Sequence, residues 1–290
     1  MAQRAGLLNA VLADLYGPQQ LLADGLLPAE LVFGHNNYLW PCQGVQPPGG
    51  TYLHLYAVDL ARAPDGRWWV TADRTQAPSG AGYALENRQI VSRAFPELYR
   101  DLTVRDAKVY LETLAGLRRV HAVLRRLDDD FCDPLELRTD SALGVPGLLE
   151  AVRQGNVLVA NALGSGVLES PGLPGFLPAI AEKLLGEELL LPSVASWWCG
   201  EPPVLDKALE QLDELLVRAS FPSQSFAPVF GRDLDEAQRA ELAERLKARP
   251  YAYVAQALAQ LSQAPVWQPE EGQLAPRAIG MRVFAVASAE

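Results

Sequence analysis

A hairpin-and-loop segment between Tyr52 and Arg88 constrains this chain more than any other part of its sequence. It reads YLHLYAVDLARAPDGRWWVTADRTQAPSGAGYALENR. Pro64-Asp65-Gly66 is a turn sequence between two runs of strand-forming residues, so the segment predicts two antiparallel strands. The first strand ends on an acid, Asp59, and the second ends on Asp73-Arg74. A Pro-Ser-Gly loop follows, and a helix is expected to open near Glu86-Asn87-Arg88.

The length of the turn decides which residue faces Asp59. Paired residues in a hairpin have a constant sum of residue numbers. A two-residue turn at Asp65-Gly66, or a four-residue loop, therefore places Asp59 opposite Ala72, with Arg74 diagonal on the same face and Asp73 on the other. A three-residue loop instead sets Asp59 opposite Asp73, which gives a usable carboxylate pair. We favour the first register, in which Arg74 balances Asp59 as a salt bridge; as a third alternative, both acids are solvated strand ends.

The composition is that of an ordinary folded protein. The chain has 290 residues, 49% of them hydrophobic and 21% charged, which suffices for one large or two medium domains. The net charge of -10 argues against a general binder of nucleic acid or anionic membranes. No run approaches the roughly 20 apolar residues of a membrane span, and the N-terminus does not resemble a signal peptide. Three scattered cysteines indicate neutral thiols and no structural zinc, so we expect a cytoplasmic protein.

The remaining sequence alternates helix and strand patterns. Apolar residues at helical spacing over 4–26 predict an initial helix. Short strand patterns occupy 103–126 and 157–161, a helix is expected up to Arg153, and the last part after Pro250 reads as strands. The other predicted elements are helices at 174–186, 203–215 and 234–248 and a strand at 213–219. This order predicts an α/β or α+β architecture.

Six sequence blocks, in order along nearly the whole chain, resemble the circularly permuted ATP-grasp proteins of the second type, relatives of the ATP-grasp half of glutathionylspermidine synthetase. The blocks are DRTQAPSGAGYALENR, RRLDDDFCDPLELR, GNVLVANALGSGV, FPSQSFAPVFGRDL, RPYAYVAQ with LSQAPVW, and RVFAVA. Their combination is specific, although each block alone is not. The chain is most similar to the branch whose members often carry a following helical alpha-E domain, so an alpha-E domain protein is an expected partner.

The resemblance implies a circularly permuted ATP-grasp-like fold in three parts that form one composite unit. Residues 1–100 would carry the hairpin that holds the metal and the helix that opens near Glu86-Asn87-Arg88. Residues 101–200 would form a central α/β part, and 201–290 the nucleotide-binding part. Family members usually have a further α/β stretch where Arg100 here runs directly into Asp101. They also continue beyond the position of Glu290. We therefore expect a missing stretch near residue 100 and an incomplete C-terminal part.

The resemblance also implies a reaction, the ATP-dependent ligation of a carboxylate and an amine with ATP and Mg²⁺, on a small peptide-like or amine substrate. Asp59, with Asp73 in the three-residue-loop register, would hold the metal. The second strand commonly ends in Glu-Asp-Asn in the family, whereas Ala72 and Arg74 stand at the Glu and Asn positions here. These departures favour the alternative of a catalytically degenerate module that serves as a binding or scaffold protein.

Nucleotide contacts are implied on two strands. Arg218 would contact phosphate, or it is a structural arginine on a strand edge; the loop after it has no glycine before Gly231. Ala257 replaces a glutamate that commonly follows the adenine hinge in the family. That hinge would be Tyr253, Val254 and Gln256, whose backbone would read the base edge.

Substrate contacts are implied in loops and on charged strands. Arg125 lies beside the acidic run 128–130 and would orient the substrate, although an internal ion network explains it equally well. Arg282 would also orient the substrate, and it forms with Arg125 the predicted pair of catalytic residues. It sits on an apolar strand and needs an anionic partner, either a carboxylate of the protein or a ligand. The other expected substrate contacts are Ser79, Gly80, Asn87 and Asn161.

Overall fold

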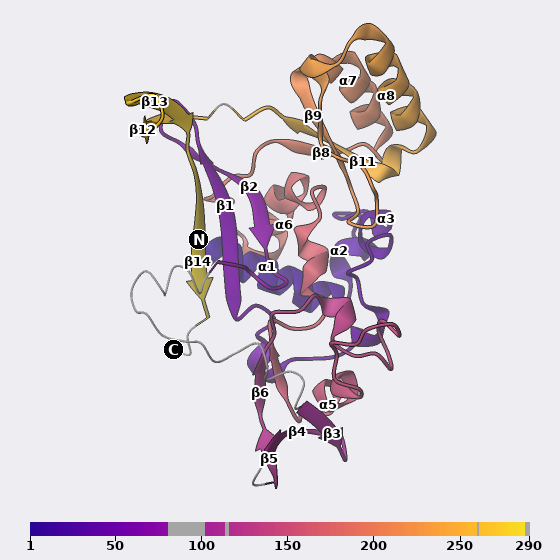
Figure 1. The fold of residues 1–290 in the computed structure, drawn as a ribbon. Coiled ribbons are helices and arrows are strands. Elements are labelled where there is room, and N and C mark those ends of the chain that lie inside the picture. Colours follow the sequence, from indigo (N-terminus) through magenta and orange to yellow (C-terminus); the bar gives the residue numbers. More distant parts are fainter. Residues whose placement is uncertain (81–101, 114–115, 260, 288–290) are drawn as a thin grey trace.

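The computed structural model describes residues 1–80, 102–113, 116–259 and 261–287 (Figure 1). Helices and strands alternate through this part of the chain, so the predicted mixed α and β architecture is confirmed. The helix expected near Glu86-Asn87-Arg88 falls outside the described residues. Among the helices in the described ranges, none combines the length and apolar character needed to cross a membrane.

The described elements follow each other along the chain in the order of their labels in Figure 1. The α-helices are α1 (Ala2–Leu15), α2 (Gln20–Ala23), α3 (Ala29–Phe33), α5 (Leu148–Arg153), α6 (Leu177–Leu185), α7 (Pro202–Glu210) and α8 (Glu236–Ala248). The strands are β1 (Leu55–Arg62), β2 (Trp68–Arg74), β3 (Leu102–Arg105), β4 (Lys108–Thr113), β5 (Gly116–Val120), β6 (Ala122–Leu124), β7 (Leu158–Ala160), β8 (Ser196–Trp198), β9 (Leu215–Ala219), β10 (Val229–Phe230), β11 (Tyr253–Ala257), β12 (Gln263–Gln268), β13 (Gln273–Ala278) and β14 (Gly280–Val286). Short 3₁₀ turns are η1 (Trp40–Cys42), η2 (Pro48–Gly50), η3 (Asp129–Phe131), η4 (Ser165–Glu169), η5 (Leu173–Gly175), η6 (Leu212–Glu214), η7 (Gly231–Asp233) and η8 (Pro250–Ala252).

The first helix is shorter than the predicted 4–26, because it ends at Leu15. Pro18 has no N–H to continue the helical hydrogen bonds. The carboxylate of Asp14 accepts hydrogen bonds from the backbone N–H groups of Gln20 at 2.9 Å and Leu21 at 3.0 Å. These bonds begin the separate short helix α2, so a single helix over 4–26 was the wrong prediction.

The hairpin loop has three residues, Pro64–Gly66, and not the two or four that we favoured. A hydrogen bond of 2.8 Å from the N–H of Ala63 to the carbonyl of Arg67 closes it. Gly66 adopts a φ of +88°, which a residue without a Cβ tolerates best. With regular pairing after this loop, Asp59 would have faced Thr71, and Asp73 would have lain on the same face of the sheet as Asp59.

A bulge at Thr71 restores the favoured register. Leu60 pairs with Val70, whereas Asp59 pairs with Ala72, so Thr71 is the extra residue in β2. Its hydroxyl donates a hydrogen bond of 3.1 Å to the carbonyl of Asp59. The alternative of Asp59 facing Asp73 is therefore wrong.

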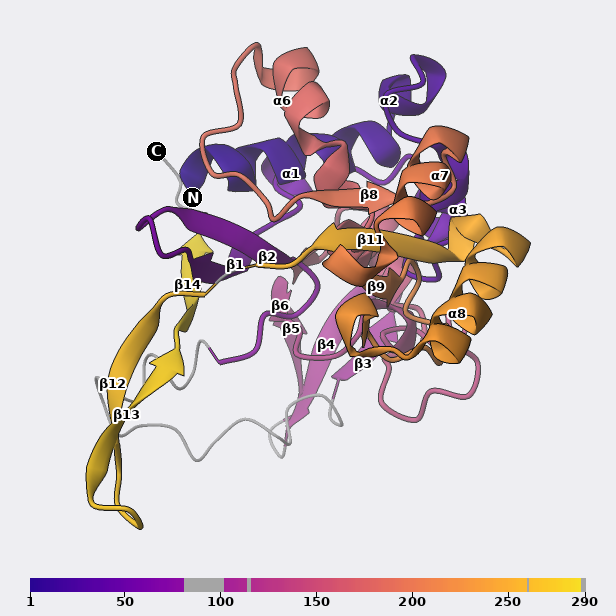
Figure 2. The same cartoon turned by 90° about the horizontal axis from the view of Figure 1, so that it is seen from above.

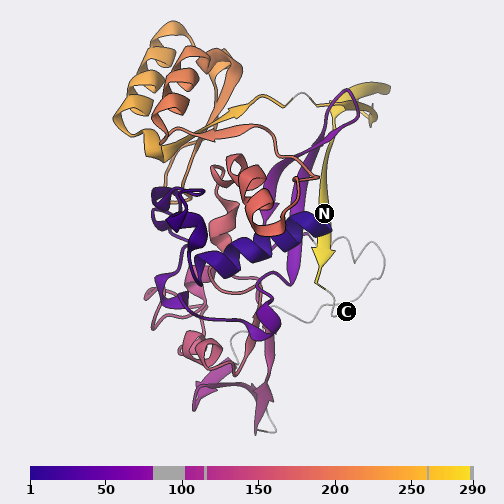
Figure 3. The ribbon, with the colours of Figure 1, turned by 180° about the vertical axis from the view of Figure 1, so that it is seen from behind.

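The hairpin belongs to a sheet of three strands with the order β14-β1-β2. β14 comes from the far end of the chain and runs antiparallel to β1, which sets Arg282 directly opposite Asp59. Figure 3 shows α1 crossing one face of this sheet. The β12–β13 ribbon projects away from the rest of the molecule just before β14 (Figure 2). The sheet thus pairs β14, from the last described part of the chain, with the first hairpin, and Asp59 lies on its central strand.

Two hydrophobic clusters organise the interior. The larger one draws on helices and strands from Leu7 to Ala181, together with Trp198, Phe221 and Val254. It spans the boundary between the predicted parts 1–100 and 101–200, which therefore share one core. The smaller one lies between Cys199 and Ala255, where α7 and α8 pack on the four-stranded sheet β10-β9-β11-β8. The three-part division itself stays a prediction.

A buried ion pair fastens α1 to the hairpin. Arg4 is completely buried and Asp73 is 5% exposed. The guanidinium of Arg4 donates to both carboxylate oxygens of Asp73, at 2.8 and 2.6 Å, and to the carbonyl of Leu191 at 3.0 Å and the hydroxyl of Ser193 at 2.9 Å. The hydroxyl of Tyr56 also donates to Asp73, at 2.5 Å. Asp73, the second acid of the hairpin, therefore forms a structural ion pair in the core.

We predict that Arg4→Met lowers the free energy of unfolding by about 3–5 kcal/mol, because the carboxylate of Asp73 then stays buried without its cation. Urea denaturation followed by circular dichroism measures this loss. The double variant Arg4→Met/Asp73→Asn keeps an acceptor for Tyr56 and removes the charge, so it should recover part of the loss. A loss below about 1 kcal/mol for Arg4→Met would place the pair among ordinary surface ion pairs and contradict the anchoring role.

Candidate functional site

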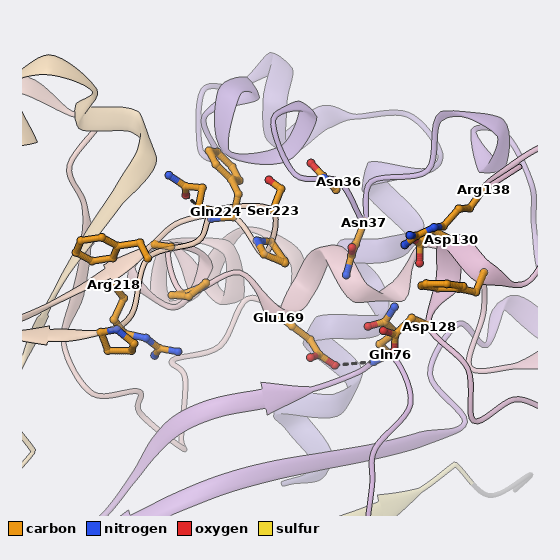
Figure 4. A pocket seen from close by; sticks show the side chains of 17 residues that line it. Asn36, Asn37, Gln76, Asp128, Asp130, Arg138, Glu169, Arg218, Ser223 and Gln224 are labelled. Atoms are coloured by element: carbon orange, nitrogen blue, oxygen red, sulfur yellow. Dashed lines mark hydrogen bonds and ion pairs between the residues drawn. The ribbon is translucent and has the colours of Figure 1, made fainter. Parts of the chain in front are cut away.

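A cavity of about 550 Å³ lies between β9 with the loop that follows it and the loops after α3, β2 and β6 (Figure 4). Arg218 of β9 lines one end, and Glu169 of η4 and Gln76 line its middle. Asp130 lies at the far end, where its carboxylate pairs with Arg138 at 3.4 Å. The cavity is therefore cationic at one end and mixed in charge at the other.

Arg218 is half-buried in this wall. Within the described ranges its guanidinium has no ion pair or side-chain hydrogen bond. Burial lowers the pKa of Arg218, and the nearby positive charge of Arg74 lowers it further. Half-buried charges are normally paired, so the predicted phosphate residue lies on a cavity and has no counter-ion among the described residues.

Glu169 links the cavity to the hairpin. Its Oε1 accepts hydrogen bonds of 2.8 Å from the backbone N–H groups of Thr75 and Gln76. Its Oε2 lies 3.9 Å from Nη1 of Arg74. One carboxylate thus holds the end of β2 and faces the guanidinium that stands at the family's asparagine position.

Asp59 is held between two guanidinium groups. Arg282 binds it in a bidentate manner, Nε to Oδ1 at 2.6 Å and Nη2 to Oδ2 at 2.9 Å. Arg74 reaches Oδ2 with Nη2 at 3.0 Å and Nε at 3.1 Å. Burial raises the pKa of Asp59, but the hydrogen bonds from Arg282 and Arg74 outweigh it and hold the pKa below its usual range. The expected salt bridge from Arg74 is confirmed. Of the two partners left open for Arg282, a carboxylate of the protein or a ligand, the carboxylate is present, and its role toward a substrate stays a prediction.

These contacts do not fit a magnesium site on the hairpin. Magnesium requires oxygen ligands at 2.0–2.1 Å in octahedral geometry, and guanidinium groups already occupy both oxygens of Asp59. Asp73, the second predicted ligand, lies on the opposite face with Arg4. Among the described residues, no group of three or more His, Cys, Asp or Glu side chains is arranged to hold a metal ion.

The Pro-Ser-Gly loop lies on the other side of Asp59. Nη1 of Arg282 donates to the carbonyl of Ser79 at 3.2 Å and to its hydroxyl at 3.3 Å. Ser79 and Gly80 line a second, open cavity together with Arg282 and Phe284. Asn87, the third residue expected in this loop and helix, lies outside the described residues.

Arg125 and Asn161 are structural in this fold, which corrects their predicted roles toward a substrate. Arg125 is buried, donates to the carbonyls of Asn161 and Leu127 at 2.8 Å, and forms an ion pair with Asp129. The internal ion network that we kept as an alternative is the one present.

The amide of Asn161 is fully used. It accepts hydrogen bonds from the N–H groups of His54 and Leu55, both at 2.8 Å, and donates to the carbonyls of Leu55 and Thr75, both at 2.6 Å. An amide has two donors and one oxygen with two lone pairs. Asn161 therefore ties the start of β1 to the end of β2 and has no hydrogen-bonding capacity left for a substrate.

The predicted adenine hinge lies in the middle of a sheet. β11 pairs with β9 on one side and with β8 on the other. Tyr253, Val254 and Gln256 are buried, and Nε2 of Gln256 donates to the hydroxyl of Ser196 at 2.9 Å. Because neighbouring strands use both edges of β11, its backbone cannot read a base edge at these residues. This prediction is corrected accordingly.

The loop after Arg218 closes on itself. The N–H of Phe221 donates to Oε1 of Gln224 at 3.0 Å, and the N–H of Phe226 donates to the carbonyl of Gln224 at 2.9 Å. Gly231 packs so closely that a Cβ there would lie 1.7 Å from the carbonyl oxygen of Leu212. The first glycine after the loop is thus required for packing, and the loop offers no glycine-rich backbone to wrap phosphates.

Sequence reasoning missed two residues that shape the site. Arg4 continues the apolar stripe of α1 at helical spacing from Leu7 and Leu8, and a charge on such a stripe signals a buried partner. Glu169 directly follows the apolar residues of η4. A lone acid in that position was the available signal for a contact to the hairpin.

The chain belongs to the family described as circularly permuted ATP-grasp type 2. The model of this family matches residues 1–101 and 99–290. The two matched pieces meet where we expect a missing stretch, and that stretch stays a prediction. Proteins of the ATP-grasp superfamily generally bind ATP and Mg²⁺.

Curated relatives from bacteria cover nearly the whole chain. The chain is 38% identical to uncharacterized protein Rv2567 of Mycobacterium tuberculosis over 348 residues, which is 99% of this chain and 39% of the relative. It is 32% identical to uncharacterized protein sll0335 of Synechocystis, over 91% of this chain and 68% of the relative. It is 30% identical to uncharacterized protein Rv2411c of M. tuberculosis, over 99% of this chain and 63% of the relative. The chain spans about two fifths of the length of the first of these relatives.

A buried histidine supports the cavity wall. His35 is 2% exposed, packs against Phe221 and directly precedes the cavity residues Asn36 and Asn37. Its Nδ1 accepts a hydrogen bond of 3.2 Å from the N–H of Asn37. Burial lowers the pKa of His35 to about 4, so the imidazole is neutral in the folded protein.

We predict that the protein loses stability in mild acid through His35. Its folded pKa lies below the ordinary value of 6.5, so protonation favours the unfolded chain. The stability is present above that value and is lost as the pH falls toward 4. Between about pH 7.5 and about pH 5 the loss is about 2 kcal/mol. Urea denaturation at both pH values measures it, and His35→Gln should show a smaller difference; an equal difference in the two proteins would contradict the role of His35.

Proposed function

We propose that this chain is a binding module of the ATP-grasp superfamily, whose cavity takes an anionic ligand such as a nucleotide and whose hairpin does not serve as the magnesium site of a ligase. The observation that carries the proposal is the state of Asp59, bound on both oxygens by Arg282 and Arg74. A ligase of this fold places magnesium on the phosphates to neutralise the charge that develops during transfer. Here the hairpin carboxylates are neutralised by the protein itself.

The cavity supports the binding half of the proposal. Its volume of about 550 Å³ lies within the usual range for small-molecule sites. Arg218 supplies a positive charge at one end that has no counter-ion in the part of the chain that the structure describes. An anion there would remove the cost of leaving a half-buried guanidinium without a partner.

The competing function is a working carboxylate–amine ligase, which family membership favours. It would require Asp59 to leave both guanidinium groups before it could hold metal. It would also require a base-binding element other than Tyr253, Val254 and Gln256, because β11 is paired on both sides. The binding module needs neither change.

Titration of the full chain with ATP by isothermal calorimetry, in EDTA and in Mg²⁺, separates these functions. We expect binding in EDTA and no requirement for magnesium, because the cations at the cavity belong to the chain. Binding that appears only with Mg²⁺ would contradict the proposal and support a ligase. Absence of binding in both conditions would also contradict it, and would favour a scaffold acting through a partner such as an alpha-E domain protein.

A variant designed to gain metal binding tests whether the residues of the hairpin prevent a magnesium site. We predict that Ala72→Glu/Arg74→Asn/Arg282→Gln acquires Mg²⁺ binding that calorimetry detects with the metal alone. This variant restores the family's Glu-Asp-Asn and also removes the bidentate partner of Asp59. Carboxylate and amide oxygens then replace a methyl group and two guanidinium groups beside Asp59. Ala72→Glu alone is the matched control, because Arg74 and Arg282 still occupy Asp59. Equal magnesium affinity in the wild-type protein and the triple variant would contradict the prediction.

A further inference from the structure

The ribbon of β12 and β13 has one face that is apolar and exposed. The ribbon projects away from the rest of the molecule (Figure 2). Trp267 pairs directly with Leu274, and Pro265 pairs with Pro276 two residues away on the same face. All four side chains are exposed, that of Trp267 by 57%. Because a two-stranded ribbon by itself is only marginally stable in water, such a face indicates a binding surface.

Prolines prevent the ribbon from binding through its edges. Pro265 and Pro276 lie opposite each other, one on each strand. Proline has no N–H, so the outer edge of each strand lacks a donor at this position for a further strand. Binding therefore takes place through the exposed face, where Trp267 is the largest apolar side chain.

An apolar cavity of about 400 Å³ lies at the base of the same ribbon. The N–H of Ser262, just before β12, donates a hydrogen bond of 2.7 Å to the carbonyl of Arg62 and fixes the base to the end of β1. The cavity walls come from the β1–β2 hairpin, the segment before β8 and the segment after β11. Their main apolar residues are Ala61, Pro64, Trp69, Val194, Leu258 and Ala259.

The tip of the ribbon is acidic, whereas the rim of the cavity is basic. Glu270 and Glu271 lie exposed in the turn between β12 and β13. Arg62 and Arg67 are exposed at the rim. Arg67 pairs with Asp65 at 2.7 Å, and Arg62 has no ion pair within the described ranges. Two arginines against one aspartate leave the rim with a net positive charge that complements the tip.

We propose that two copies of this chain bind each other through these features, with Trp267 of each ribbon in the basal cavity of the other copy. The paired strands carry the tip about 20 Å away from its own base, so tip and cavity of one chain do not meet. A two-fold axis between the ribbons makes both contacts at once, as in any isologous dimer. The inference is independent of the anion cavity at Arg218.

The indole and the charges around it determine the strength of this dimer. Tryptophan is among the residues that most often anchor an interface, because it buries a large apolar area in one pocket. In the dimer Glu270 and Glu271 of each copy approach Arg62 and Arg67 of the other, which fixes the orientation. Contacts limited to the ribbon and the cavity are smaller than a standard interface. We therefore expect a Kd in the micromolar range.

Sedimentation velocity of the full chain, from about 1 to about 200 µM, measures this association. We expect the mass to rise from that of a monomer toward that of a dimer. Trp267→Ser removes the anchor and Ala259→Phe fills the cavity, so each should weaken association by at least about tenfold. Trp40→Ser is the matched control, because Trp40 is 58% exposed and lies outside both ribbon and cavity. It should associate as the wild-type protein does.

An exchange of charges tests whether the occupant is a second copy. Glu270→Lys/Glu271→Lys and Arg62→Glu/Arg67→Glu should each fail to self-associate, because like charges then meet at both contacts. An equimolar mixture of the two variants should form a heterodimer. In that mixture lysines meet glutamates at one contact, and the wild-type charges meet at the other.

Three results would overturn the inference. The first is a wild-type protein that stays monomeric up to about 200 µM, which would leave the ribbon to a different partner. The second is equal weakening by Trp267→Ser and Trp40→Ser, or an unchanged dimer in Ala259→Phe. The third is absence of a heterodimer in the charge-exchanged mixture. Circular dichroism verifies that each variant is folded, as expected for substitutions at exposed positions.

Discussion

Asp59 occupies the central strand of the β14-β1-β2 sheet and is bound from both sides by strand neighbours, Arg282 of β14 and Arg74 of β2. Its side chain is only 22% exposed, so the carboxylate needs cations close by to remain ionised. The two arginines meet this need and also connect the last described strand of the chain to the first hairpin. Removal of either would leave the acid with one cation, whereas removal of the acid would leave two guanidinium groups in mutual repulsion.

The two hairpin acids have separate roles because of one bulge. With regular pairing after the three-residue loop, Asp59 would have faced Thr71, and Asp73 would have lain on the same face of the sheet as Asp59. The extra residue Thr71 shifts the pairing, so Asp59 faces the second, open cavity and Asp73 faces α1. Because of this shift, Asp73 lies in the core, where Arg4 and Tyr56 bind it. Asp59 is then the single carboxylate of the two strands on the outer face. A site for a divalent ion needs more than one such ligand.

Local patterns in the sequence predicted the hairpin, the register at Asp59 and most of the later helices and strands. They did not predict the loop length, because neither the loop nor the compensating bulge at Thr71 leaves a distinctive pattern. They also misassigned Asn161 and Arg125, since a polar residue that serves backbone groups far along the chain looks the same in sequence as one that serves a ligand. The hinge prediction failed for a related reason. A buried apolar strand has the same sequence pattern at the edge and in the centre of a sheet. Only the pairing of β11 with both β8 and β9 shows that its backbone groups are already hydrogen-bonded.

The arginines also suggest why an acid persists on a hairpin that does not fit a metal ion. Arg74 and Arg282 together carry two positive charges, as Mg²⁺ does, but they are attached to the chain and need no dehydration of a small, strongly hydrated ion. Without a carboxylate between them, the two guanidinium groups would repel each other. Asp59 holds both of them on one face of the sheet. Asp59 is thus the counter-ion of the two arginines, an arrangement that does not fit a magnesium ion on the hairpin.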